Sequence, residues 1–238
     1  MLLKTILFDA GDILYNKPNR KSSVIKFLTE RGYSAPLEND PVEKAKRRDA
    51  HAGRIETESF FEWLMEHYGV TNSSDFADGI SLLKNQQSDV HFFEGVPETL
   101  HELKSRGFKL GIVTNTFNSR TEKNTWFKSV GISDIWDSYA DSFELQITKP
   151  DPRIYLAALE PLNESPENAA FVGHAKIEID GAKAIGLTTI IFNPDPDCKE
   201  SDYQIEKFKD LLKIPPILNS KKKKYKFKNT LKFMKTLI

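Results

Sequence analysis

The sequence contains a single cysteine, no long apolar run and no net charge. Because Cys198 has no second cysteine to pair with, an internal disulfide framework and a cysteine-rich zinc site are excluded, and a reducing cytosol suits the chain. No run of 18 apolar residues is present, so we expect no membrane-spanning segment. The N-terminal apolar stretch is broken by Lys4 and ends at Asp9, which makes it too short for a signal peptide. We therefore expect a cytoplasmic protein.

The balanced charge hides an asymmetry between the body of the chain and its end. Eight lysines and no acidic residue lie in 221–238, so the first 220 residues carry 26 basic against 34 acidic residues, a net charge of −8. We expect the body to have no specific affinity for nucleic acid. Residues 215–238 are expected to form a basic tail that contacts an anionic surface or another subunit, or that is simply solvated. The sequence leaves the oligomeric state open.

Apolar runs that each fit a buried strand alternate with helical patterns along most of the chain. This alternation predicts an α/β fold with a doubly wound, Rossmann-like parallel sheet of about five strands. The expected strands are residues 3–8, 109–114, 137–140, 169–173 and 188–192. Over residues 16–92 the apolar spacing is helical and gives no strand signal, so we expect an inserted all-helical cap domain there. Residues 1–15 and 93–214 then form the α/β core.

Polar residues follow the predicted strands at the points where they end. Asp9 ends the first strand, Thr114 and Asn115 end the second, and Lys149 lies in a K-P-D-P turn after the third. Because the carboxyl ends of parallel strands meet at one edge of a sheet, we expect these residues to line one crevice. Asp9 would attack as a nucleophile, Thr114 and Asn115 would hold the transferred group, and Lys149 would neutralise charge. The alternative is that Asp9 only caps a turn.

These segments resemble the four motifs of the haloacid dehalogenase superfamily, in order. The matching stretches are F-D-A-G-D-I-L at 8–14, I-V-T-N at 112–115, T-K-P-D-P-R-I-Y at 148–155 and V-G-H-A-K-I-E-I-D-G-A-K-A-I-G-L at 172–187. The resemblance covers about residues 3–214, and it implies a hydrolase with an inserted helical cap after motif one. The first expectation is a phosphatase that acts on a small phosphorylated metabolite through an aspartyl intermediate.

Motif one departs from the pattern of the family's phosphatases. Those enzymes carry a second aspartate two residues after the first, which acts as general acid and then as general base. Gly11 stands at that position here, and only its backbone carbonyl could meet a metal. Asp12 is one residue further on and is expected to point elsewhere. We expect Gly11 and Asp12 to line the substrate site.

Motif four departs as well, because His174 replaces the aspartate that binds magnesium in the family. Magnesium prefers oxygen ligands, so Mg²⁺ remains possible but weakened. A softer divalent ion such as Zn²⁺, Ni²⁺ or Co²⁺, or no metal at all, is the alternative. The candidate metal ligands are Asp9, Gly11, His174 and Glu178. The spacing of Glu178 resembles that of an acidic residue in the dehalogenase branch, where no metal is used.

Two arginines of the expected cap are candidates for binding a substrate anion. If their helix closes over Asp9, Arg47 or Arg48 could bind the anion bidentately; otherwise they form a solvated charged face. Two other functions stay open. The chain is either a catalytically impaired binding or regulatory protein that keeps the fold, or, less favoured, a metal-independent 2-haloacid dehalogenase.

Overall fold

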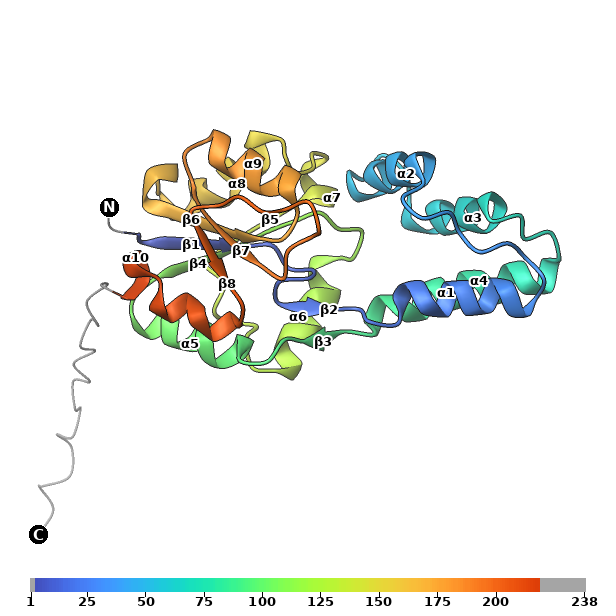
Figure 1. The fold of residues 1–238 in the computed structure, drawn as a ribbon, viewed down its shortest axis with the longest axis horizontal. Coiled ribbons are helices and arrows are strands. Elements are labelled where there is room, and N and C mark those ends of the chain that lie inside the picture. Colours follow the sequence, from blue (N-terminus) through green and yellow to red (C-terminus); the bar gives the residue numbers. More distant parts are fainter. Residues whose placement is uncertain (1–2, 219–238) are drawn as a thin grey trace, which may run out of the picture.

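The computed structural model describes residues 3–218, and at its centre lies a sheet of six parallel strands (Figure 1). The strands run in the order β5-β4-β1-β6-β7-β8. Their bounds are β1 Thr5–Phe8, β4 Lys109–Thr114, β5 Ser138–Asp141, β6 Ala169–Gly173, β7 Thr188–Phe192 and β8 Tyr203–Ile205. The strand order reverses beside β1, which pairs with both β4 and β6. The predicted doubly wound α/β fold is confirmed.

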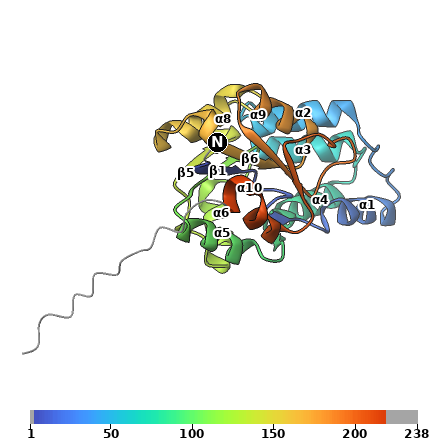
Figure 2. The ribbon, with the colours of Figure 1, turned by 60° about the vertical axis from the view of Figure 1, so that its left-hand side comes forward.

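Helices cover both faces of the sheet because its central strand is apolar on both sides. Ile6 and Phe8 belong to one buried layer and Leu7 to the other, as the alternation of side chains along a strand requires. The first layer is closed by α5 (Val96–Ser105), α6 (Arg120–Ser129), the 3-10 helix η4 (Phe208–Lys213) and α10 (Pro215–Leu218). The second is closed by α8 (Pro152–Leu159) and α9 (Lys176–Ala184) (Figures 1 and 2).

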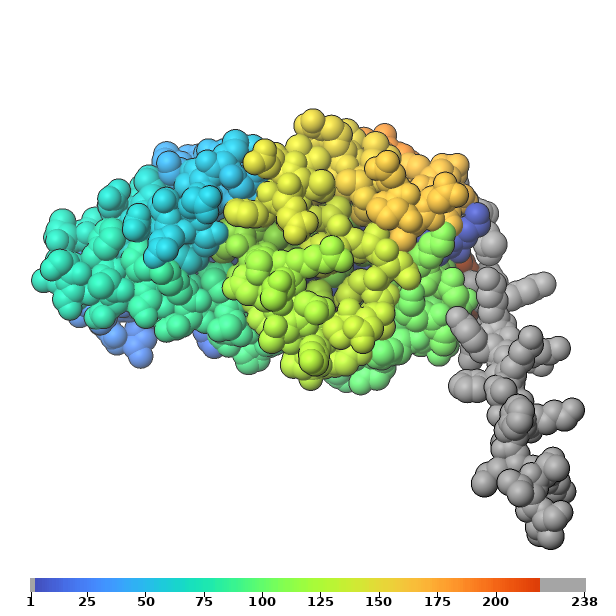
Figure 3. Space-filling model, turned by 180° about the vertical axis from the view of Figure 1, so that it is seen from behind, coloured from blue at the N-terminus to red at the C-terminus, as the bar shows by residue number. Residues whose placement is uncertain are grey.

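Four helices form a separate lobe beside the sheet, and they are the predicted helical cap. They are α1 (Arg20–Glu30), α2 (Pro41–His51), α3 (Thr57–His67) and α4 (Ser73–Asn85). The lobe has its own apolar core, which includes Phe60, Phe61, Leu64 and Met65. Phe117, from the core loop after β4, packs on Phe60 and Phe61 and so joins the two parts. Figure 3 shows the cap surface in contact with the adjoining surface of the core.

The segment expected to lack strands carries one at each end. Strand β2 (Tyr15–Asn16) pairs antiparallel with β3 (His91–Phe92), which ties together the two points where the chain enters and leaves the cap. Strands of two residues produce no periodic pattern, so the sequence gives no signal for them. The expectation of no strand within 16–92 is therefore wrong at the edges of that range.

The sixth strand of the sheet, β8, was not among the predicted ones. It has three residues at the edge of the sheet, and only Ile205 is buried. Short helical segments occupy several connections as well. They are η1 (Gln86–Ser88), α7 (Ser142–Leu145), η2 (Glu160–Leu162) and η3 (Pro166–Asn168).

The core continues past residue 214, where we expected the tail to begin. Pro215 opens α10, which is compatible with the first turn of a helix because the N–H that proline lacks has no partner there. Ile217 is fully buried in the first apolar layer. The lysine-rich segment 221–238 lies outside the described residues, so its contact with an anionic surface or another subunit stays a prediction. Within residues 3–218, no helix is both long and apolar enough to cross a membrane.

Candidate active site

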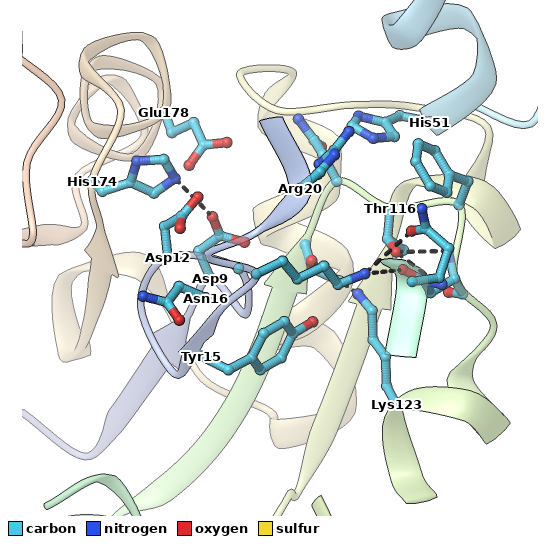
Figure 4. Close-up of a pocket in the computed structure, with 17 residues that line it drawn as sticks. Asp9, Asp12, Tyr15, Asn16, Arg20, His51, Thr116, Lys123, His174 and Glu178 are labelled. Carbon is cyan, nitrogen blue, oxygen red and sulfur yellow. Dashed lines mark hydrogen bonds and ion pairs between the residues drawn. The ribbon is translucent and has the colours of Figure 1, made fainter. Parts of the chain in front are cut away.

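Polar residues from neighbouring strands meet where the parallel strands end. The backbone N–H of Asp9 donates to the carbonyl of Val172 at 3.0 Å, which fixes the end of β1 against β6. This edge lies at the topological switch point, where ligands of open α/β sheets bind. It borders a cavity of about 310 Å³ (Figure 4). The sequence-predicted residues that line this cavity are Asp9, Gly11, Asp12, Thr114, Asn115, His174 and Glu178.

Lys149 holds two carboxylates together beneath this cavity. Its fully buried Nζ lies 2.8 Å from Asp9 Oδ1 and 3.0 Å from Glu178 Oε1. Burial alone would lower the pKa of Lys149, but Asp9 and Glu178 outweigh that influence and raise it. The residue is positioned through its backbone, because its N–H donates to Asn115 Oδ1 at 2.9 Å. Lys149 is therefore a buried cation, and Asn115 orients its loop.

The two carboxylate oxygens of Asp9 differ, because one has close polar partners and the other does not. Oδ1 accepts the N–H of Ala10 at 2.7 Å in addition to its contact with Lys149. Oδ2 lies 3.7 Å from His174 Nε2, which is beyond hydrogen-bond distance. Oδ2 is therefore the oxygen available to attack a substrate.

His174 is held as a cation between two carboxylates. Its Nδ1 lies 3.1 Å from Asp195 Oδ1, a residue that the sequence analysis did not single out. Burial lowers the pKa of His174, but Asp195, Asp9 and Glu178 together raise it to about 9. The imidazole is thus protonated at neutral pH. A metal ligand must be a neutral imidazole, so the histidine is not poised to bind an ion.

The residues present do not fit magnesium. Asp9, His174 and Glu178 offer ligand atoms within 4.8 Å of one another, and Glu178 Oε2 has no hydrogen-bond partner in the described part of the chain. However, one of the three donors is a nitrogen that carries a proton, whereas Mg²⁺ requires oxygen ligands. Both carboxylates already contact the ammonium of Lys149. This set of donors therefore does not suit Mg²⁺.

Asp12 lies closer to the nucleophile than the sequence suggested. We expected Asp12 to line the substrate site with its side chain pointing away from Asp9; it does line the cavity, but beside Asp9 (Figure 4). The reason is a left-handed backbone conformation with φ of 58°, which aspartate tolerates. Burial of the carboxyl raises the pKa of Asp12, the charge of Asp9 adds to the rise, and His174 opposes it. Asp12 is therefore a carboxyl group that holds a proton more readily than usual.

Arg47 and Arg48 do not reach this cavity. Arg47 forms an ion pair with Glu43 and packs over Phe60. Both arginines line a second cavity of about 690 Å³, on the side of α2 that faces residues 146–153. Their side chains lie on the side of α2 that faces the core, where Asn115, Lys149 and Glu178 line the same cavity. That one of the two arginines binds a substrate anion stays a prediction, because this second cavity is also lined by Lys149 and Glu178.

Three cations that line the cavity were missed. Lys17 and Arg20 come from the segment that enters the cap, and Lys123 comes from α6. His51 lines the cavity too, with burial lowering the pKa of its imidazole well below the usual range, so it is neutral. Lys17 and Arg20 could have been suspected, because they follow Asp9 within a dozen residues. Nothing in the sequence marks Lys123, since it lies on a helix whose other residues are mostly exposed.

The sheet, the buried Asp–Lys pair at its switch point and the helical cap together define a doubly wound α/β protein with an inserted cap. The chain belongs to the haloacid dehalogenase-like hydrolase family, which residues 6–192 match. A glyceraldehyde 3-phosphate phosphatase from Methanopyrus kandleri is 23% identical over 231 residues, which are 90% of this chain and 97% of that protein. The pyrophosphatase PpaX from Bacillus velezensis is 34% identical over 162 residues, 63% of this chain and 74% of that protein.

The fold is also shared with solved structures. The HAD-hydrolase YfnB from Bacillus subtilis, solved with magnesium bound, superimposes with a TM-score of 0.67 at 21% identity, over 90% of this chain and 99% of that one. Relatives with a different reaction occur too. An (S)-2-haloacid dehalogenase from Pseudomonas is 27% identical over 177 residues, 72% of this chain and 74% of that protein. Family membership therefore places the chain among haloacid dehalogenase-like hydrolases and leaves its reaction and its substrate to be inferred.

Proposed function

We propose that the chain hydrolyses a small phosphate monoester through a phosphoryl group carried on Asp9. The observation that carries this proposal is the 2.8 Å contact between buried Lys149 and Asp9 Oδ1, which leaves Oδ2 free to attack. Two relatives named as phosphatases support a phosphorylated substrate. A cavity of about 310 Å³ lies at the small end of ligand sites, so the substrate is small.

In the first step, Asp9 Oδ2 attacks phosphorus as the bond from phosphorus to the leaving oxygen breaks. Asp12 gives its proton to that oxygen, for which its raised pKa suits it. Thr114 and Lys149 bind the oxygens of the phosphoryl group, where negative charge must be balanced. In the second step, Asp12 takes a proton from water as the water attacks phosphorus, and the Asp9 carboxylate is released.

His174 and Lys149 supply the positive charge of this site in the proposal. Each is a cation that contacts Asp9. Their combined charge offsets the repulsion between the carboxylate and an anionic phosphoryl group. Turnover is expected to be slow, because Asp12 is displaced by one residue from position 11, where Gly11 stands in place of the family's second aspartate.

The second candidate function is that of a binding or regulatory protein without turnover, which Gly11 and the protonated His174 favour. A metal-independent dehalogenase is the third reading, since Lys149 contacts Glu178 as well as Asp9. A panel of phosphorylated metabolites and 2-haloacids, each incubated with and without Mg²⁺, Mn²⁺ and Co²⁺, separates these functions. We expect phosphate release that does not depend on added metal. Halide release alone, or binding without any product, would overturn the proposal in favour of one of the others.

A further inference from the structure

The cavity has an acidic side and a cationic side. Asp9, Asp12 and Glu178 lie together on one side with His174, whereas Lys123 lies on the other and Arg20 lies between them (Figure 4). The acidic side is balanced by Lys149 and His174, as described above. The cationic side has no such balance, and its three cations come from separate positions in the chain.

Lys17 has only neutral partners. Its Nζ donates to Gln87 Oε1 at 3.2 Å and to Asn118 Oδ1 at 3.1 Å, and it lies over the ring of Trp126. It forms no ion pair with any described carboxylate. Burial lowers the pKa of Lys17 to about 8, with the charge of Arg20 adding to the shift. The ammonium is therefore held at a fixed point without a counter-charge.

Lys123 is the most buried of the three, with 1% of its surface exposed. Its Nζ donates to Thr114 Oγ1 at 3.2 Å and contacts no carboxylate within the described residues. Burial lowers the pKa of Lys123 to about 7, although Asp9 and Asp141 oppose the shift. Keeping a lysine charged in this buried position costs free energy unless an anion binds next to it.

Arg20 stands at the start of α1 and lines the cavity with its side chain unpaired. Within residues 3–218, its guanidinium has neither an ion pair nor a hydrogen bond. Burial lowers the pKa of Arg20 to about 10, and Arg47 adds to the shift while Glu43 opposes it. It stays protonated at neutral pH. A guanidinium offers five N–H donors in a planar fork, which matches a carboxylate or a phosphate.

We propose that Lys17, Arg20 and Lys123 form a second anion subsite, which binds a carboxylate or phosphate group on the leaving side of the substrate. The proposal rests on the proposed function in one respect: the first anionic group is the phosphoryl group at Asp9. These three basic side chains have no carboxylate partner, and a second anionic group beside them would favour their protonated forms. The cavity volume limits the distance between the two anionic groups to that within a small metabolite.

Binding of non-hydrolysable probes tests the subsite directly. Calorimetry compares ethylphosphonate, which has one anionic group, with phosphonoacetate and methylenediphosphonate, which add a carboxylate and a phosphonate. We expect the wild-type protein to bind at least one two-anion probe about tenfold or more tightly than ethylphosphonate. The tighter of the two identifies whether the second group is a carboxylate or a phosphate. Equal affinity for all three probes would overturn the subsite.

Variants then test whether Arg20 and Lys123 cause the tighter binding of the two-anion probes. Arg20→Met and Lys123→Met each keep an apolar stem and remove the charge, and each should reduce the preference about tenfold to a hundredfold. Lys128→Met, an exposed change on the same helix as Lys123, is the matched control and should leave the preference unchanged. If Lys123→Met does not fold, Arg20→Met decides alone, because Arg20 is only half-buried. A preference that survives Arg20→Met would overturn the assignment.

Hydrolysis assays separate this proposal from the proposed function. Phosphoglycolate and ethyl phosphate differ mainly in a carboxylate, so the subsite predicts a lower KM for phosphoglycolate. Equal KM values with clear turnover would support hydrolysis and overturn the subsite. A probe preference that Arg20→Met abolishes, without turnover of any phosphate ester, would support the subsite and overturn hydrolysis.

Discussion

His174 Nε2 lies 3.7 Å from Asp9 Oδ2, at a position where the family's phosphatases carry a carboxylate. The imidazolium is fixed from its other side by Asp195, at 3.1 Å. A positive side chain thus faces Asp9 at the point where a carboxylate would attract a metal ion. This contact explains why the ligand set does not suit Mg²⁺.

Replacing the histidine by a carboxylate should restore a preference for magnesium. His174→Asp removes a cation and adds an oxygen donor beside Asp9, which is the ligand type that Mg²⁺ requires. We expect tighter Mg²⁺ binding in calorimetry than for the wild type. His174→Asn, which removes the charge without adding a carboxylate, serves as the control. Octahedral Mg²⁺ bound by the wild-type protein at low millimolar concentration would contradict this account.

Protonation of His174 should also stabilise the fold over a defined range of pH. The pKa of His174 is raised from 6.5 to about 9, so the folded state holds the proton more tightly than the unfolded state. The resulting stabilisation is complete below pH 6.5 and is lost as the pH rises through about 9. Urea unfolding of wild type and His174→Gln from pH 6 to 10 measures the difference. A difference between the two free energies of unfolding that does not shrink with rising pH would speak against a protonated histidine.

An acid–base group at position 11 should raise turnover above the level that Asp12 supports. A Cβ placed on Gly11 would meet no atom within 4 Å, so the cavity has room for a side chain there. General acid–base catalysis contributes about 10²–10⁴-fold, and part of that should appear in the kcat of Gly11→Asp. Gly11→Asn has the same shape without the titratable proton and should give no gain. An equal gain from both variants would mean that the aspartate does not act as acid and base.

Removing the charge of Lys149 should destabilise the protein strongly. Lys149→Met leaves Asp9 and Glu178 buried without their shared cation, and breaking a buried ion pair in this way costs about 3–5 kcal/mol. Lys176→Met breaks an exposed pair with Asp180 and should cost no more than about 1 kcal/mol. Denaturant unfolding measures both free energies. Similar values for the two variants would show that the buried triad contributes little.

The sequence predicted the sheet well where burial leaves a pattern. Strands such as β4 and β6 are apolar runs enclosed on both faces, and their bounds agree with the expected ones. Strands β2, β3 and β8 were missed because a run of two or three residues is too short to show a periodicity. Where these short strands begin, and which strands they pair with, depends on tertiary contacts.

The site was predictable only in the part that sits at strand ends. Asp9 and Lys149 could be placed together because parallel strands share an edge. Arg20 and Lys123 could not, since their approach depends on how the cap and α6 fold over that edge. Arg47 lines the neighbouring cavity with Lys149 and Glu178, and its binding of a substrate anion stays a prediction, because composition shows that a helix is charged but not where it lies against the core.

The central claim is that Asp9 is the nucleophile, and phosphate release by Asp9→Asn tests it most directly. An amide of the same shape cannot form the acyl phosphate, so release should fall to the rate without enzyme. Asp134→Asn, an exposed change far along the chain, should retain the wild-type rate. Release by Asp9→Asn at the wild-type rate would contradict the covalent mechanism.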